Sequence, residues 1–168
     1  GQTRFSVVRY GNVVGSRGSV VPFFLAKRKE GVLPITDPRM TRFWITLPQG
    51  VEFVLNCLDE MSGGEIFIPK IPSLKIVDLA QAGVPGCKFK DIGIRPGEKV
   101  HETLVSEDEG LYTYEHKDKY VACPEIVAAR SRRKGGKPLA ADFEGYTSDN
   151  NTDWLSVKDL RRLLDREG

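Results

Sequence analysis

The sequence predicts an α/β fold, and three observations support that prediction. Apolar, β-branched segments alternate along the chain with segments whose apolar residues recur at helical spacing. Glycine and proline separate these segments at short intervals, as the turns between strands and helices require. The chain has 168 residues, of which 40% are hydrophobic, so it is long enough to bury a core.

The expected elements follow one another in that alternating order. We expect strands over 4–10, 32–36, 65–68, 88–94 and 112–123. We expect helices over 23–29, 47–61, 74–83 and 98–104, and a final helix from residue 157. Pro34 places the second strand at a sheet edge, because proline cannot donate a hydrogen bond to a strand ladder.

Local signals mark where the helices begin. Thr46 and Gln49 have the spacing of a capping box, and Ser156 with Asp159 repeats that pattern before the final helix. Ser73 is expected to cap the helix over 74–83. In the second helix, apolar residues recur at helical spacing, at Val51, Val54, Leu55 and Leu58.

The first strand indicates how the chain relates to a larger fold. Residues 5–10 are apolar on both faces, which is typical of a strand buried between neighbours in a parallel sheet. Such a strand almost at residue 1 predicts that the chain starts inside a larger fold. Without those neighbours the strand leaves an apolar patch and unpaired edges, so we expect the isolated chain to self-associate.

Charge and hydropathy exclude two classes of protein. The formal net charge is +2, which argues against a surface devoted to nucleic acid or membrane. No apolar run approaches the roughly 20 residues that a membrane span needs. The basic segment 130–137 has no stacking platform beside it, so we interpret it as a solvated loop.

The residues that commonly bind metals are scattered along the chain. Cys57, Cys87 and Cys123 lie far apart, and His101 and His116 share no metal-ligand spacing. We therefore expect no metal site, no disulfide and no catalytic histidine. Unpaired cysteines suit a reducing, cytoplasmic setting.

The loop over 11–18 invites comparison with a dinucleotide-binding fingerprint. It lies between a predicted strand and a predicted helix, and Asp37 is 19 residues beyond Gly18, near the place of a ribose-binding carboxylate. However, the glycine spacing is GxxxGxxG, and Asp37 precedes Pro38, which favours a turn. We therefore expect no primary NAD site here. We interpret the loop as a turn whose polar residues touch a ligand bound mainly by other elements: Asn12, Ser16, Arg17 and Ser19.

Two arginines lie in settings that suit a diphosphate. Arg42 stands next to a bulky aromatic pair, and Arg95 lies on a Pro/Gly turn after a predicted strand. Guanidinium groups match phosphate oxygens in a bidentate way and stay charged at all relevant pH values. The alternative is that each arginine pairs with a carboxylate, for which the candidates are Asp37, Glu98 and Glu102. For the two arginines together we favour ligand binding.

Five sequence blocks cover nearly the whole chain in a fixed order, at 6–24, 36–46, 64–73, 93–99 and 146–151. Together they closely resemble the nucleotide-sugar dehydratases of the extended short-chain dehydrogenase superfamily. An Arg-Phe-Trp-Ile-Thr block and a Tyr-x-Ser-x-x-Asn tail make the chain most similar to the inverting UDP-N-acetylglucosamine 4,6-dehydratases. Those enzymes begin pseudaminic acid synthesis.

The resemblance implies a fold, a cofactor and a set of binding residues. Residues 1–168 would form the C-terminal, substrate-binding half of an extended short-chain dehydrogenase, with the last strands of its Rossmann domain near 4–36. The complete enzyme would be a homo-oligomer that uses NADP. By match, contacts to a UDP-N-acetylhexosamine fall on Asn12, Arg42, Arg95, Asn150 and Asn151, with Arg95 at the diphosphate. Contacts to the cofactor fall on Val13, Arg17, Gly18 and Ser19.

The chain departs from the family in its catalytic signature. No Tyr-x-x-x-Lys occurs in the sequence, and the glycine fingerprint of the N-terminal half is also missing. We therefore assign no catalytic residue and expect the chain to be inactive alone, with NADP bound by the complete enzyme. Three alternatives stay open: a stand-alone nucleotide-sugar-binding or interaction module, a part of a related epimerase or retaining dehydratase, and a chain completed in trans by a separate N-terminal polypeptide.

Overall fold

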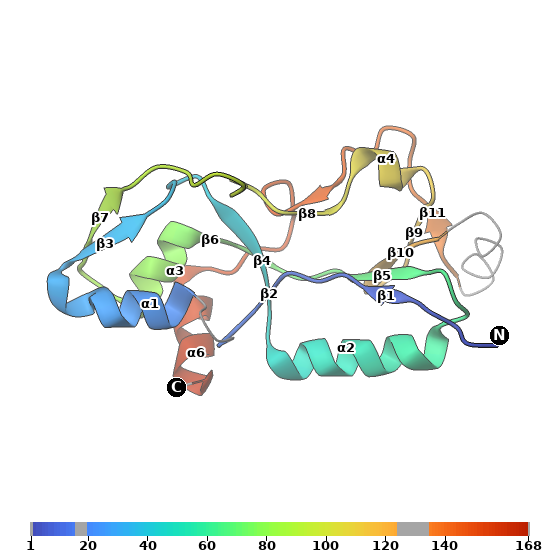
Figure 1. Cartoon of the computed structure of the whole chain (residues 1–168), viewed down its shortest axis with the longest axis horizontal. Coiled ribbons are helices and arrows are strands. Elements are labelled where there is room, and N and C mark those ends of the chain that lie inside the picture. Colours follow the sequence, from blue (N-terminus) through green and yellow to red (C-terminus); the bar gives the residue numbers. More distant parts are fainter. Residues whose placement is uncertain (1, 16–19, 124–134, 168) are drawn as a thin grey trace. The chain divides into compact units, whose positions relative to one another are not determined.

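The computed structural model describes residues 2–15, 20–123 and 135–167, and it divides into two compact units (Figure 1). Unit 1 comprises residues 1–11, 46–71 and 103–147. Unit 2 comprises residues 12–45, 72–102 and 148–168. Each unit is therefore assembled from three separate stretches of sequence. The mixture of strands and helices in both units confirms the predicted α/β class.

A five-stranded sheet in the order β1-β5-β10-β9-β11 forms the centre of unit 1. Its strands are β1 (Val7–Val8), β5 (Ile66–Pro69), β9 (Thr113–Glu115), β10 (Lys119–Ala122) and β11 (Lys137–Pro138). The β1–β5 pair is parallel, and the other pairs are antiparallel. The other elements among the described residues of unit 1 are a two-stranded sheet and two helices: β8 (Thr103–Val105), β12 (Tyr146–Thr147), α2 (Leu47–Glu60) and α4 (Glu107–Gly110).

Unit 2 contains a three-stranded and a two-stranded sheet with three helices. The first sheet has the order β2-β4-β6, formed by β2 (Asn12–Val13), β4 (Thr41–Ile45) and β6 (Ser73–Lys75). The second pairs β3 (Val32–Ile35) with β7 (Lys88–Asp91) in parallel. The helices are α1 (Val20–Lys27), which continues into a 3-10 turn over Arg28–Glu30, α3 (Ile76–Gly83) and α6 (Val157–Glu167).

The core of unit 2 is one continuous apolar cluster. Leu79 of α3 and Leu160 of α6 are almost fully buried in it, as are Leu33 of β3 and Leu74 of β6. The apolar residues predicted to face inward on α3 therefore do so. Burying a leucine side chain contributes about 1.5–3 kcal/mol, so this cluster stabilises unit 2 from within.

The start signals of two helices are confirmed. Thr46 and Gln49 form both hydrogen bonds of a capping box at α2, and proline stands in the first turn. At α6 the amide of Asp159 donates to the Ser156 hydroxyl, and the Ser156 amide donates to the Asp159 carboxylate. A local pattern of four residues was sufficient in both cases, because capping depends on neighbours in sequence.

The structure corrects the predicted burial of the first strand. Only Val7 and Val8 are in strand conformation, and Phe5 and Val7 are 77% and 54% exposed. Within the described residues β1 has β5 as its single neighbour, and nothing covers its outer face. The apolar sequence of residues 5–10 was therefore a poor guide to burial, because Phe5 and Val7 are exposed to solvent in this structure.

Two further expectations were wrong. Ser73 does not cap a helix, because its pairing with Phe43 of β4 holds it extended in β6, and α3 begins at Ile76 without a side-chain cap. The segment 98–104 is not helical. The Thr41 amide of β4 donates to the Val100 carbonyl, and this long-range hydrogen bond is incompatible with a helix there. In both places, long-range pairing overrode the local propensity.

The single strand expected over 112–123 is instead two antiparallel strands, β9 and β10. Further elements were not predicted from the sequence, namely β2, β4, β8, β11, β12 and α4. The other expected elements agree apart from their bounds. The helix expected over 23–29 begins earlier, at Val20, and the strand expected over 88–94 ends at Asp91. Among the described residues, no helix has the length and apolar character to cross a membrane.

Candidate functional site

Unit 2 contains a cavity of about 530 Å³, a size that suits a small-molecule ligand. Strands β2 and β4, helix α1, the end of β3 and the turn after β7 supply its walls. The lining residues are Asn12, Val13, Val20, Phe23, Phe24, Pro34, Ile35, Thr36, Met40, Arg42, Trp44, Ile76, Ile92, Arg95 and Glu98. Four residues predicted from the sequence to bind ligand therefore meet around one space: Asn12, Val13, Arg42 and Arg95.

The pairing of β2 with β4 brings the first of these residues together. Asn12 lies opposite Trp44 in a parallel register, and Arg42 lies two residues before Trp44 on the same strand. Since side chains alternate along a strand, Arg42 and Trp44 project to the same face. The cavity lies on that face of the sheet.

The guanidinium of Arg42 is held by the backbone around it. Its N–H groups donate to the carbonyl oxygens of Thr41 at 2.6 Å, Val100 at 3.0 Å and Lys99 at 2.9 Å. Its Nε lies 3.4 Å from a carboxylate oxygen of Glu102. Burial lowers the pKa of Arg42, although the nearby carboxylates oppose that shift. Most of the N–H groups of Arg42 are therefore engaged in fixing the segment 99–102 to β4.

Arg95 differs from Arg42 in that only its backbone is engaged in hydrogen bonds among the described residues. It lies on an exposed turn, where the Arg95 amide donates to the Glu98 carboxylate at 3.3 Å and the Glu98 amide donates to the Arg95 carbonyl at 3.0 Å. Gly97 adopts a φ of 82° in this turn, a conformation that favours glycine. The guanidinium of Arg95 has no partner among the described residues, so its N–H groups remain available to a ligand.

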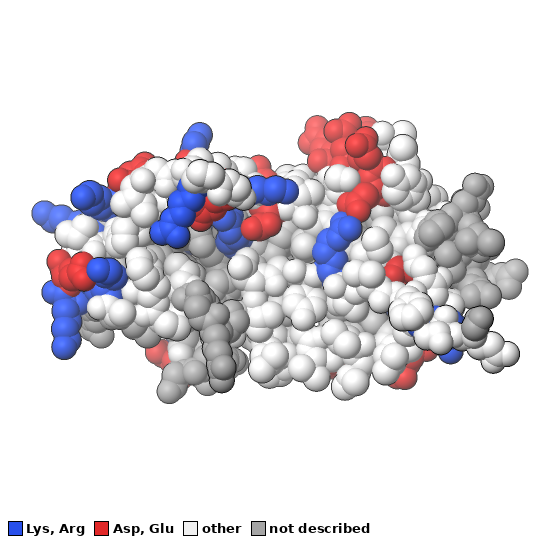
Figure 2. Space-filling view, in the orientation of Figure 1, with Lys and Arg blue, Asp and Glu red and all other residues white. Residues whose placement is uncertain are grey.

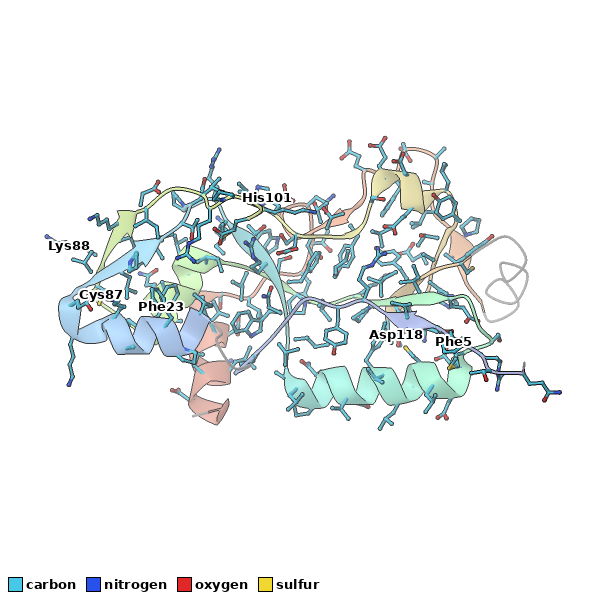
Figure 3. The ribbon with its side chains drawn as sticks, viewed as in Figure 1. Phe5, Phe23, Cys87, Lys88, His101 and Asp118 are labelled. Carbon is cyan, nitrogen blue, oxygen red and sulfur yellow. The ribbon has the colours of Figure 1, made fainter. Side chains whose placement is uncertain are left out.

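Aromatic residues form one wall of the cavity. Phe23 and Phe24 from α1 lie with ring centroids 6.1 Å apart, and Phe23 can be located on α1 in Figure 3. Trp44 is 4% exposed, and its indole N–H is the single buried side-chain polar atom without a hydrogen-bond partner in the described part of the chain. Leaving such a donor unpaired costs about 1–3 kcal/mol, which an acceptor from a ligand or water would offset.

The structure settles the alternative partners that the sequence left open. Asp37 pairs with Arg39 at 2.7 Å, and this contact lowers the pKa of the carboxyl to about 2. Asp37 does not line the cavity, so it is not placed as a ribose-binding carboxylate there. Arg42 does approach one of its candidate partners, Glu102, whereas Arg95 approaches Glu98 only through its backbone.

The other predicted contacts lie elsewhere or outside the described residues. Asn150 is exposed, and Asn151 donates through its side chain to the Ser73 hydroxyl at 3.0 Å. Neither lines the cavity. Arg17, Gly18 and Ser19 lie outside the described residues, so of the four predicted cofactor contacts only Val13 is placed.

His101, which is labelled in Figure 3, belongs to a polar cluster with Thr41 of β4 and Ser148. Its Nδ1 lies 2.8 Å from the Thr41 hydroxyl, which is also 2.6 Å from the Ser148 hydroxyl. Both hydroxyl groups belong to buried residues, so neither can reach a substrate from this position. The cluster positions the strand that carries Arg42, and it offers no nucleophile.

Sequence reasoning missed part of the cavity wall. Glu98 lines the cavity, although the sequence suggested it only as a partner for arginine. Trp44 lines it as well, and its apolar character gave no sign of a ligand. Proximity to Arg95 in a Pro/Gly turn was the one signal that could have identified Glu98.

The polysaccharide biosynthesis protein family matches residues 1–124 of this chain. The chain belongs to that family. Among curated members of similar sequence, an inverting UDP-N-acetylglucosamine 4,6-dehydratase from Campylobacter jejuni serotype O:2 is 51% identical over 97% of this chain and 52% of its own length. A UDP-glucose 4-epimerase from Rickettsia conorii is 39% identical over 98% of this chain and 50% of its own length.

A solved structure supports the fold as well as the family. The protein Pen from Bacillus thuringiensis matches with a TM-score of 0.79 and 34% sequence identity, over 97% of this chain and 49% of Pen. The chain thus spans about half the length of the relatives it matches. The family and the α/β fold predicted from the sequence blocks are confirmed.

Proposed function

We propose that this chain supplies the UDP-sugar-binding part of an inverting UDP-N-acetylglucosamine 4,6-dehydratase. The observation that carries the proposal is the cavity of unit 2, where the predicted residues Asn12, Arg42 and Arg95 converge. The identity of 51% to a protein named for that activity supports this choice of reaction. The substrate would be a UDP-linked N-acetylhexosamine.

Arg95 carries the recognition of the diphosphate in this proposal. Its guanidinium is exposed and unpaired among the described residues, so binding a phosphate breaks no existing ion pair. Arg42 contributes by holding the segment that follows the Arg95 turn, through Lys99 and Val100. This division assigns the ligand contact chiefly to one arginine and the positioning to the other.

The remaining walls suit the other parts of a nucleotide sugar. A carboxylate such as Glu98 accepts hydrogen bonds from hydroxyl groups, which a ribose or a hexose offers. Phe23, Phe24 and Trp44 provide apolar surface for a ring. Asn12 can donate and accept at the end of β2.

Cofactor binding and catalysis belong, in our proposal, to the other half of the complete enzyme. NADP would supply the hydride acceptor there. Of the four predicted cofactor contacts, only Val13 falls within the described residues, where it lines the cavity. We therefore assign no chemical step to this chain and propose that it has no dehydratase activity alone. The resemblance also carries the proposals of a pseudaminic acid pathway and a homo-oligomeric complete enzyme.

Calorimetry with UDP and uridine tests the proposal. UDP should bind the chain more tightly than uridine, because only UDP offers a diphosphate to Arg95. Arg95→Ala should weaken UDP binding by about 1.5–3 kcal/mol, the usual contribution of a hydrogen bond to a charged group. Arg39→Ala is the matched control, since Arg39 is exposed and lies outside the cavity. Equal binding of UDP and uridine, or equal effects of the two substitutions, would contradict the proposal.

A second candidate is a part of a UDP-glucose 4-epimerase. The observation in its favour is the 39% identity to relatives that carry that name. Competition between UDP-N-acetylglucosamine and UDP-glucose for the chain distinguishes the two. Tighter binding of the acetylated sugar supports the dehydratase, and tighter binding of UDP-glucose supports the epimerase.

A further inference from the structure

The turn that carries Arg95 is held at its two ends and not by burial. Residues 93–97 are all exposed, and the surface over the segment that joins β7 to β8 carries charges of both signs in Figure 2. Before the turn, the Ile92 amide donates to a carbonyl of β3 at 2.9 Å. After the turn, residues 99–102 are attached to β4. The position of Arg95 therefore depends on how firmly those residues are held.

Ser148 adds a second attachment to the one that Arg42 makes. Its amide donates to the Glu102 carbonyl at 2.8 Å, and the Glu102 amide donates to its hydroxyl oxygen at 2.9 Å. The Ser148 hydroxyl lies 2.6 Å from Thr41 Oγ1 of β4, which in turn lies 2.8 Å from Nδ1 of His101. Ser148 and Thr41 are 0% and 3% exposed, so their hydroxyl groups depend on each other and on His101 for hydrogen bonds.

The protons of this chain of hydrogen bonds can be assigned, because it begins at a backbone amide. The Glu102 amide can only donate, so Ser148 Oγ accepts from it. The Ser148 proton then has Thr41 Oγ1 as its acceptor, and the Thr41 proton has Nδ1 of His101. No other arrangement gives both hydroxyl protons an acceptor among the described residues. Nδ1 is therefore the unprotonated nitrogen of a neutral imidazole, and Nε2 carries the proton.

A proton on Nδ1 is incompatible with this arrangement. An imidazolium donates from both of its nitrogens, so the Thr41 proton loses its acceptor. If the Thr41 hydroxyl turns to Ser148 instead, the Ser148 proton is the one left without an acceptor, and a buried unpaired group is unfavourable in either case. Two carboxylates attract such a proton to the imidazole: Asp149 lies 3.8 Å from Nε2, and Asp37 interacts with His101 through its charge.

We propose that His101 is a positioning residue for the turn that carries Arg95, and that it acts through Thr41 and Ser148 only while its Nδ1 accepts a hydrogen bond. Neutral His101 keeps the end of the turn attached to β4, and protonated His101 loosens it. The inference rests on the proposed function, since the position of Arg95 matters for binding a diphosphate. A less ordered arginine must be ordered on binding, so affinity for the sugar nucleotide falls in acid.

Hydrogen exchange of the ligand-free chain tests this positioning directly. The parent is compared with His101→Asn, whose side-chain oxygen can accept in place of Nδ1 and gains no proton in this range. At about pH 8 the Glu102 amide should exchange at similar rates in both, because a histidine is then mostly neutral. At about pH 5.5 it should exchange about fivefold or more faster in the parent. Comparing two chains at one pH removes the intrinsic pH dependence of exchange.

Two further variants separate the chain of hydrogen bonds from other effects. Thr41→Val removes the central hydroxyl at nearly constant shape, so the Glu102 amide should exchange faster at both pH values, whereas Thr41→Ser keeps the hydroxyl and should behave as the parent. His116 is the only other histidine of the sequence. His116→Asn should therefore retain the pH response of the parent.

Calorimetry with UDP-N-acetylglucosamine gives the second readout. Both of its phosphates are bridged, so the ligand lacks the second ionisation that a terminal phosphate undergoes at about pH 6. The parent should bind it about fivefold or more tightly at about pH 8 than at about pH 5.5. His101→Asn should bind it equally at both.

Two outcomes would overturn the inference. Equal exchange of the Glu102 amide in the parent and in His101→Asn at acid pH would show that His101 does not hold the turn. A pH response that disappears in His116→Asn would assign the effect to the other histidine. Failure of the parent to bind UDP-N-acetylglucosamine at either pH would instead contradict the proposed function, because the exchange of the Glu102 amide is measured without ligand.

Discussion

The two units of this molecule differ in what covers their apolar residues. In unit 2, α1, α3 and α6 close over the sheets, and Leu33, Leu74 and Leu79 are almost inaccessible to solvent. In unit 1, the apolar residues of α2 are divided between a buried face and an exposed stripe. The apolar residues that form the core of unit 2 are thus buried, whereas a large part of the apolar surface of α2 in unit 1 is exposed.

The two units also differ in the polar residues that line their cavities. The cavity of unit 2 contains an unpaired arginine, an asparagine and a glutamate. Unit 1 contains a smaller one of about 350 Å³, and the only charged residue lining it, Glu109, is already engaged by Arg9 in two hydrogen bonds. The contrast is what we expect if unit 2 recognises the ligand, as proposed.

The largest expected effect is the difference in stability between substituting a buried leucine of unit 2 and an exposed leucine of unit 1. Leu74→Ala removes a fully buried side chain from the core of unit 2 and should lower the free energy of unfolding by about 2–5 kcal/mol. Leu58→Ala changes a leucine that is 62% exposed in unit 1 and should alter it by about 0.5 kcal/mol or less. Urea unfolding of both variants measures the difference. Similar losses would show that α2 is covered in solution.

Substituting the two arginines of the cavity should have different effects on stability. Arg42→Ala removes three hydrogen bonds, to the carbonyl oxygens of Thr41, Lys99 and Val100, of which Val100 keeps the Thr41 amide as a second donor. The substitution should cost about 1.5–3 kcal/mol of unfolding free energy. Arg95→Ala breaks no side-chain hydrogen bond and should leave stability nearly unchanged. Thermal melts of the two variants without ligand give the comparison. A large loss in Arg95→Ala would show that this arginine is structural.

A smaller effect concerns the start of α2. Thr46→Ala removes the side-chain oxygen that accepts from the Gln49 amide, and helix caps of this kind contribute about 1 kcal/mol. Thr46→Ser retains the oxygen and serves as the matched control. Urea unfolding should rank the parent and the serine variant together, with the alanine variant below them.

The smallest effect is a pH dependence in unit 1. The guanidinium of Arg9 lowers the pKa of Glu109 to about 2. Because the folded-state pKa is depressed, the pair stabilises the fold at neutral pH. This stabilisation is lost as the pH falls from about 4.5 towards 2. The pair is partly exposed, so its contribution is about 1 kcal/mol or less.

Glu109→Gln provides the measurement for this pair. The difference in unfolding free energy between parent and variant should be present at pH 7 and vanish near pH 2. Subtracting the variant removes the parallel titration of Asp37, whose pKa is also lowered to about 2. A difference that stays constant from pH 7 to pH 2 would show that the Arg9–Glu109 contact adds no charge-dependent stability.

Local features of the fold were predictable from the sequence, and long-range ones were less so. The capping residues Thr46 and Ser156 act on amides three residues away, so their patterns identified α2 and α6 correctly. Ser73 carries the same kind of signal, yet its pairing with Phe43 prevailed. The segment 98–104 was assigned to a helix because its bonds to Thr41 and Arg42 are invisible in the local sequence.

The same distinction applies to the candidate site. Arg95 was identified because a charged residue in a Pro/Gly turn is conspicuous on its own. Trp44 was missed as a lining residue, since its role depends on the pairing of β2 with β4. The exposure of Val51, Leu55 and Leu58 on α2 was likewise hidden, because periodicity shows that residues share a face and does not show what lies against it.

Hydrogen exchange with and without UDP tests the central claim most directly, since it reports on both units in one experiment. The account predicts that UDP slows exchange of amides around the cavity, in β2, in β4 and in the turn that carries Arg95. Exchange along α2 should stay unchanged, because that helix belongs to unit 1 and none of its residues lines the cavity. Protection of α2 with no change around the cavity would contradict the assignment of ligand binding to unit 2.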